Sequence, residues 1–153
     1  MSDFAELPSP CTFQTDHYRE YSRSSKRAVP VPDVLLYLKP VGEADMTRFR
    51  VMFTVDSGAD VTILPKWNAR DLEISLDGLE PKRGSGAGGV PYGYYADPRW
   101  EAEVWLCGEW TKIPVRFFAS DDAHDALLGR KGAFDAIELV FVQGRRVMYA
   151  RRA

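Results

Sequence analysis

The sequence predicts an all-β domain that folds as a small closed barrel. Its apolar residues fall in many short segments, often alternating with polar residues, and glycine or proline residues separate these segments. Helical character is limited to brief stretches, and no internal repeat is present. At 153 residues the chain suits one domain with a buried core. Short strands, tight turns and little helix together favour the all-β class.

Each element is expected from its local pattern. In the segment 49–55, alternate residues Phe49, Val51, Phe53 and Val55 share one face of a strand. Further strands are expected at residues 34–38, 61–64, 101–106, 111–117 and 137–142 and through Val147 and Tyr149. One helical turn is expected at 67–72 and a short helix at 129–136. The five glycines between residues 84 and 93 predict a deformable hairpin followed by tyrosines.

Residues 1–30 differ in character from the rest of the chain. They contain Pro8, Pro10 and Pro30 and a polar run at 22–27, and they show no sustained period. We therefore expect residues 1–30 to form an extended or partly disordered N-terminal arm. Residues 31–153 are expected to form the folded domain.

Composition excludes several classes of function. The formal net charge of −2 provides no global field that would attract nucleic acid or an anionic membrane. No apolar stretch approaches the length of a membrane span, so we expect a cytoplasmic protein with neither a nucleic-acid nor a membrane partner. The two cysteines, Cys11 and Cys107, have the spacing of neither a zinc site nor a disulfide framework. We expect no metal and no other cofactor.

The segment 51–64 is the main candidate for chemistry. An apolar strand delivers Asp56 into the turn Ser57-Gly58, and a second apolar run leaves it. Gly58 permits a tight turn, and the small Ser57 and Ala59 leave room for a molecule to approach the carboxylate. A structural alternative is that Asp56 only caps the turn by accepting backbone hydrogen bonds.

Three segments in order support the functional interpretation. Residues 56–60, Asp-Ser-Gly-Ala-Asp, resemble the catalytic motif of the retropepsin-like aspartic proteases, in which Asp-Thr/Ser-Gly-Ala follows a strand. Residues 126–130, Ala-Leu-Leu-Gly-Arg, are similar to the strand that passes beneath the active-site loop in that family. The glycine-rich residues 84–90 resemble the tip of its flap hairpin. The resemblance spans about residues 34–141 and implies a closed acid-protease barrel with a flap hairpin and a short helix.

The resemblance implies a role for each matching residue. Asp56 would be the catalytic residue. The residues expected to support the active-site loop are Ser57, Gly58, Ala59, Asp60 and Arg130. The residues expected to form the flap or contact the substrate are Gly86, Ala87, Gly88, Gly89 and Tyr92. Asp60 would pair with Arg130 of the same chain, and Ser57 would bond across a dimer axis. Tyr92 has an ordinary alternative role, which is packing within its hairpin.

Carboxylate-catalysed peptide hydrolysis requires two acidic groups that face one water, one as general base and one protonated. The chain contains only one Asp-Ser-Gly turn with an apolar lead-in. The second carboxylate would therefore come from another copy of the chain, so we expect a homodimer that cleaves a polypeptide substrate. A second hypothesis is a non-catalytic adaptor of the same fold, which dimerises or binds a peptide.

Overall fold

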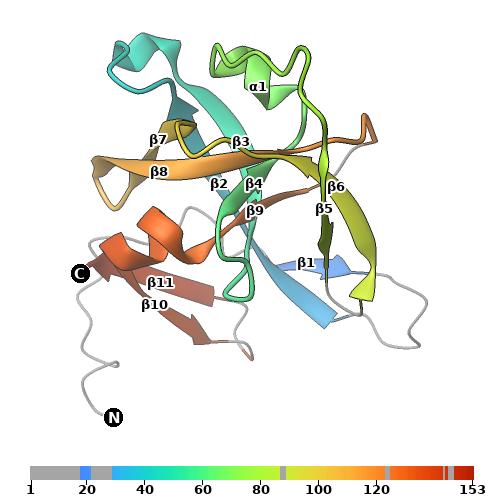
Figure 1. The fold of residues 1–153 in the computed structure, drawn as a ribbon. Helices are drawn as coiled ribbons and strands as arrows, with labels where there is room; N and C mark the ends of the chain where they lie inside the picture. Colours follow the sequence, from blue (N-terminus) through green and yellow to red (C-terminus); the bar gives the residue numbers. More distant parts are fainter. Residues whose placement is uncertain (1–17, 22–28, 87–88, 123–124, 143, 145–146) are drawn as a thin grey trace.

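Strands dominate the computed structural model of the chain, which confirms the predicted all-β class (Figure 1). The structure describes residues 18–21, 29–86, 89–122, 125–142, 144 and 147–153. Predicted boundaries are close to those observed: the segment expected at 34–38 lies within a longer strand, and the segment expected at 101–106 matches its strand at both ends.

Six strands close into a barrel. The closed path runs from β2 (Val29–Lys39) to β3 (Phe49–Val55), β9 (Ala126–Leu128), β4 (Thr62–Leu64), β8 (Glu109–Phe118) and β7 (Glu101–Leu106), which pairs again with β2. β9 lies between β3, to which it is parallel, and β4, to which it is antiparallel. Residues far apart in sequence therefore meet at the end of β3, where Asp56 follows.

Alternation along β3 places its apolar side chains in the core. Val51, Phe53 and Val55 are buried, whereas Arg50 and Met52 are exposed. The same period applies around the barrel, and the interior side chains that are fully or almost fully buried include Val34, Leu38, Val104, Ile113, Phe117 and Leu128. The prediction that alternate residues of β3 share a buried face is confirmed. The free energy gained by burying apolar area outweighs the conformational preferences of single residues.

Three further pieces extend the barrel. β1 (Tyr18–Tyr21) pairs with the start of β2, and β5 (Lys82–Ser85) with β6 (Pro91–Tyr95) forms a hairpin that joins β8 through β6. β10 (Ile137–Val142) and β11 (Val147–Arg152) make a separate two-stranded sheet. Residues 1–17 and 22–28 of the predicted arm lie outside the described part of the chain. The domain boundary at residue 30 stays a prediction.

Helical segments are short, as expected. A 3-10 turn spans Asp45–Thr47, and α1 (Asn68–Asp71) lies within the turn predicted at 67–72. The helix predicted at 129–136 is not continuous, because η4 (Arg130–Phe134) has non-helical backbone angles at Lys131 and Gly132. Gly132 has φ of +78°, and a Cβ there would lie 2.9 Å from a methyl group of Ile113 on β8. The backbone at Gly132 therefore packs closely against β8 where the first turn of the predicted helix was expected.

The turn from β7 to β8 contains Cys107 (φ +50°) and Gly108 (φ +82°). Two consecutive positive φ values are typical of a two-residue hairpin turn, in which the second position commonly carries glycine. Cys107 is disulfide-bonded, which the spacing of the two cysteines did not predict; Cys11 lies outside the described residues. Within the parts that the structure describes, no helix has the length and apolar character needed to cross a membrane.

Candidate active site

Asp56 stands at the carboxyl end of β3, at the start of a tight turn. Its backbone N–H donates to the Leu128 carbonyl at 3.1 Å, which ties the turn to β9. The Gly58 N–H donates to Oδ1 of Asp56 at 2.8 Å, and the Ala59 N–H donates to the backbone carbonyl of Asp56 at 3.1 Å. Among the described residues no donor binds Oδ2 of the partly exposed carboxylate. The turn therefore orients one carboxylate oxygen and leaves the other available.

This geometry contains the capping bond that the structural alternative predicts. A carboxylate oriented by a backbone N–H is also what general acid or base chemistry requires, so the bond does not separate the two interpretations. In either case a side chain at position 58 would crowd the carboxylate, because a Cβ there would lie 3.1 Å from Oδ1 of Asp56. Ser57 is exposed at the outer end of the turn.

β9 and the residues after it hold the turn from behind. The Arg130 N–H donates to the Ala59 carbonyl at 2.9 Å, and the Lys131 N–H donates to the Asp60 carbonyl at 2.8 Å. The Gly129 N–H donates to Oγ1 of the fully buried Thr62 at 3.1 Å. Backbone hydrogen bonds thus fix the loop on the barrel, independently of most side chains.

Gly129 is essential to this contact. A Cβ on Gly129 would lie 2.4 Å from the carbonyl carbon of Val61 and 2.7 Å from the Thr62 nitrogen. Both are backbone atoms, so no side-chain rotation can relieve the contact. Gly129 and Thr62 were not among the predicted site residues. The glycine stood within the recognised segment 126–130, whereas nothing in the sequence showed that Thr62 binds there.

The expected ion pair between Asp60 and Arg130 is present. The hydrogen bond and the charge of Arg130 hold the pKa of the Asp60 carboxyl below its ordinary value, with smaller contributions from Lys131 and Arg116. Both side chains are more than half exposed, at 66% for Asp60 and 56% for Arg130. Solvent screens such a pair, so in this single chain it adds little to what the backbone bonds already fix.

The β5–β6 hairpin carries the predicted flap residues. The Gly86 N–H donates to the Val90 carbonyl at 2.8 Å, and the Gly89 N–H donates to the Gly86 carbonyl at 3.1 Å. Gly89 has φ of +74°, which a side chain would strain. Ala87 and Gly88 lie outside the described residues. The free end of the hairpin and the turn after β3 both project toward the lower side of Figure 1.

Tyr92 packs within this hairpin. Its ring lies against Gly84 on β5, where a Cβ would come within 2.9 Å of the ring. Its ring centroid is 5.7 Å from that of Tyr94 and 5.7 Å from that of Phe118. These contacts correspond to the ordinary packing role considered for Tyr92.

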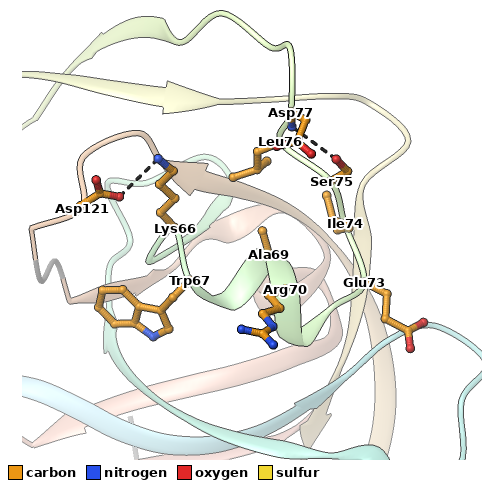
Figure 2. Close-up of a pocket in the computed structure, with 10 residues that line it drawn as sticks. All are labelled: Lys66, Trp67, Ala69, Arg70, Glu73, Ile74, Ser75, Leu76, Asp77 and Asp121. Atoms are coloured by element: carbon orange, nitrogen blue, oxygen red, sulfur yellow. Dashed lines mark hydrogen bonds and ion pairs between the residues drawn. The ribbon is translucent and has the colours of Figure 1, made fainter.

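A separate open groove of about 670 Å³ lies beside α1 (Figure 2). Lys66 and Asp121 form an ion pair of 3.3 Å across one side, and Trp67, just before α1, and Arg70, within it, also line the groove. The residues that line this groove include none of the predicted site residues. Its cationic and anionic side chains are mixed, so it does not define a ligand class. In the described residues no three histidine, cysteine, aspartate or glutamate side chains are grouped as a metal ion would need.

Comparisons with known proteins show what this chain is similar to. The model of a family described as "Aspartyl protease" matches residues 45–131. A retropepsin-like aspartic protease from Rickettsia conorii has 16% identity and a TM-score of 0.50, with 78% of this chain and 98% of that one covered. EIAV protease, solved with the inhibitor HBY-793, has 15% identity and a TM-score of 0.42, with 72% of this chain and 88% of that one covered. A search of curated proteins finds no match.

The fold is that of a retropepsin-like aspartic protease, as predicted. The family match extends over more than half of the chain and includes both the Asp56 turn and Arg130. The chain belongs to the aspartyl protease family.

Proposed function

We propose that this chain is an aspartic endopeptidase that acts as a homodimer, with Asp56 of each copy in one shared site. The observation that carries the proposal is the Asp56 turn, in which Gly58 orients one carboxylate oxygen while the other has no donor among the described residues. A carboxylate held in this way at the rim of a rigid barrel is ready to bind a water or a substrate carbonyl.

Two Asp56 carboxylates in one site would account for hydrolysis of a peptide bond. Like charges about 3 Å apart do not both ionise readily, so a pair of Asp56 side chains would share one proton and titrate as a unit. The ionised Asp56 removes a proton from a water, which attacks the scissile carbonyl. The protonated Asp56 donates to the carbonyl oxygen, and the tetrahedral intermediate collapses as a proton passes to the leaving nitrogen.

Among the described residues, no second aspartate follows an apolar strand into a Ser-Gly turn. Asp60, the nearest acidic residue in sequence, is engaged by Arg130. A two-fold axis beside the turn would bring the partner's Asp56 to the same water. The exposed Ser57 hydroxyls would then be able to bond between the two turns.

The substrate would be an extended polypeptide covered by the β5–β6 hairpin. In the described part of the chain the hairpin pairs with the barrel through β6, and Gly86 and Gly89 lie near its tip. Such a hairpin can move over a bound chain and exclude water. Tyr92, through its packing on Gly84, would brace the flap, and the predicted substrate contact would then involve its exposed side.

Cleavage of a diverse peptide mixture, read by mass spectrometry, tests the proposal. The wild type should produce cuts that disappear in Asp56→Asn, while Asp77→Asn, an exposed turn aspartate away from the site, should keep them. Thermal unfolding of each variant shows whether it is folded. An active Asp56→Asn protein would contradict the proposal. A folded wild-type dimer that binds peptides and cuts none would favour the adaptor hypothesis.

A further inference from the structure

The strand register places one row of side chains on the outer face of the barrel, next to the Asp56 turn. Thr54 on β3 is opposite Leu127 on β9, Leu127 is opposite Ile63 on β4, and Ile63 is opposite Arg116 on β8. Partners in register point to the same side of a sheet. The neighbours of these residues along each strand, such as Val55, Leu128 and Phe117, point into the core.

The row continues onto the hairpin. Phe118 lies two residues beyond Arg116 on the same face of β8 and is opposite Tyr94 on β6. Tyr92 packs on Phe118 with ring centroids 5.7 Å apart. A peptide held between the Asp56 turn and the hairpin would therefore run over a floor in which Leu127, Arg116 and Tyr94 are partly exposed, whereas Ile63 and Phe118 are buried.

Arg116 is the cation in this floor. Its guanidinium lies over the Tyr94 ring, with Cζ 5.2 Å from the ring centroid. No carboxylate of the described residues forms an ion pair with it. Asp60, whose carboxyl pKa Arg116 helps to lower, is already bound by Arg130.

We propose that Arg116 determines substrate specificity by binding the carboxylate of an acidic side chain of the polypeptide. This inference rests on the proposed function and deepens it. The guanidinium is held by Tyr94, is only partly exposed, and lies among apolar groups, so a carboxylate that reaches it forms a charge-assisted hydrogen bond. An uncharged side chain would not form this ion pair.

The register also indicates where the acidic residue lies in the substrate. Three strand spacings separate β3 from β8, which is about 14 Å, or about four residues of an extended peptide. The acidic side chain should therefore lie within about four residues of the scissile bond.

The experiment compares matched peptides. Cut sites in a peptide mixture first give the consensus, and two peptides that differ only by Glu or Gln at the acidic position are then assayed. We expect wild-type kcat/KM to favour the Glu peptide by about tenfold or more, less so at high salt. In Arg116→Gln the ratio should fall to about one, and in Arg116→Glu a Lys peptide should be preferred. Arg48→Gln is the matched control, because Arg48 stacks on Tyr37 in the same way at the other end of β3 and should keep the wild-type ratio.

Binding to the Asp56→Asn protein separates this inference from the proposed function. The same peptide pair is measured by fluorescence anisotropy with and without Arg116→Gln; if the wild type cuts nothing, the peptides come from a mixture enriched on the Asp56→Asn protein. An acidic preference that Arg116→Gln removes supports the inference even when no cleavage occurs. Equal affinity and equal cleavage of the two peptides, or an acidic preference that persists in a folded Arg116→Gln protein, would overturn it.

Discussion

The two ends of the barrel are held together in different ways. At the end away from Asp56, Lys39 on β2 forms an ion pair of 2.7 Å with Glu103 on β7, and the two side chains are 6% and 21% exposed. The Lys39 ammonium also donates to the Glu43 carbonyl and lies 5.0 Å from the centre of the Trp110 ring. Groups of the protein itself therefore bind the Lys39 ammonium.

At the Asp56 end the corresponding ion pair, Asp60 with Arg130, is mainly in solvent. Here the backbone supplies the rigidity, through Gly129 and the hydrogen bonds to the loop carbonyls. The difference shows how a protein can keep charged groups accessible at a site and still fix the loop that carries them. Side-chain electrostatics stabilise one end, and close backbone packing positions the other.

Gly129→Ala should have the largest effect. The new methyl group would meet the Val61 backbone at 2.4 Å, so β9 and the loop must separate. We expect a loss of about 2–3 kcal/mol in the free energy of unfolding, measured in urea, together with loss of peptide cleavage. Gly144→Ala, where a Cβ has no neighbour within 4 Å, should change stability by less than about 0.5 kcal/mol. A stable and active Gly129→Ala protein would show that the loop is not fixed by this contact.

Glu103→Gln should have the second-largest effect on the free energy of unfolding. It leaves the nearly buried Lys39 ammonium without its counter-ion, and we expect a cost of about 2–3 kcal/mol. Glu138→Gln breaks a more exposed pair with Arg151 and should cost less than about 1 kcal/mol. Equal costs for the two variants would remove the contrast between buried and exposed pairs.

The pH dependence of stability follows from the same pair. The hydrogen bond from Lys39 holds the pKa of Glu103 below its ordinary value of 4.5, and the Gly42 N–H and the Lys39 charge add to this. Because the folded pKa is the lower one, this stabilisation is present above pH 4.5 and is lost as pH falls through the folded value. The stability difference between the wild type and Glu103→Gln should therefore shrink below pH 4.5. A difference that stays constant down to pH 2 would contradict the assignment.

Arg130→Gln should have the smallest effect on stability. The Arg130 N–H still donates to Ala59, and the lost ion pair is screened by solvent. We expect the free energy of unfolding of the monomer to change by less than about 1 kcal/mol in chemical denaturation at low protein concentration. A loss of more than about 2 kcal/mol there would mean that the side chain supports the loop directly.

Sequence alone predicted the parts of the site that a short pattern or the family motif records. The strand into Asp56, the glycine in its turn and the pairing of Asp60 with Arg130 follow from short patterns and from the family motif. The pair of Lys39 and Glu103 was not predicted, because neither residue belongs to a recognised motif and the β2–β7 contact brings them together. Arg116 was missed for the same reason, since its place in the outer row depends on the register of four strands. The interruption of the helix expected at 129–136 was not predicted, because helical propensity does not record how closely Gly132 approaches β8.

Mixing wild-type chains with Asp56→Asn chains tests the shared site most directly. After subunit exchange in an equal mixture, only about a quarter of the dimers would carry two Asp56 carboxylates. If both are required, the activity at constant total protein should fall to about a quarter of the wild-type value. Activity of about one half would mean that each chain acts alone, and this would contradict a site shared by two chains.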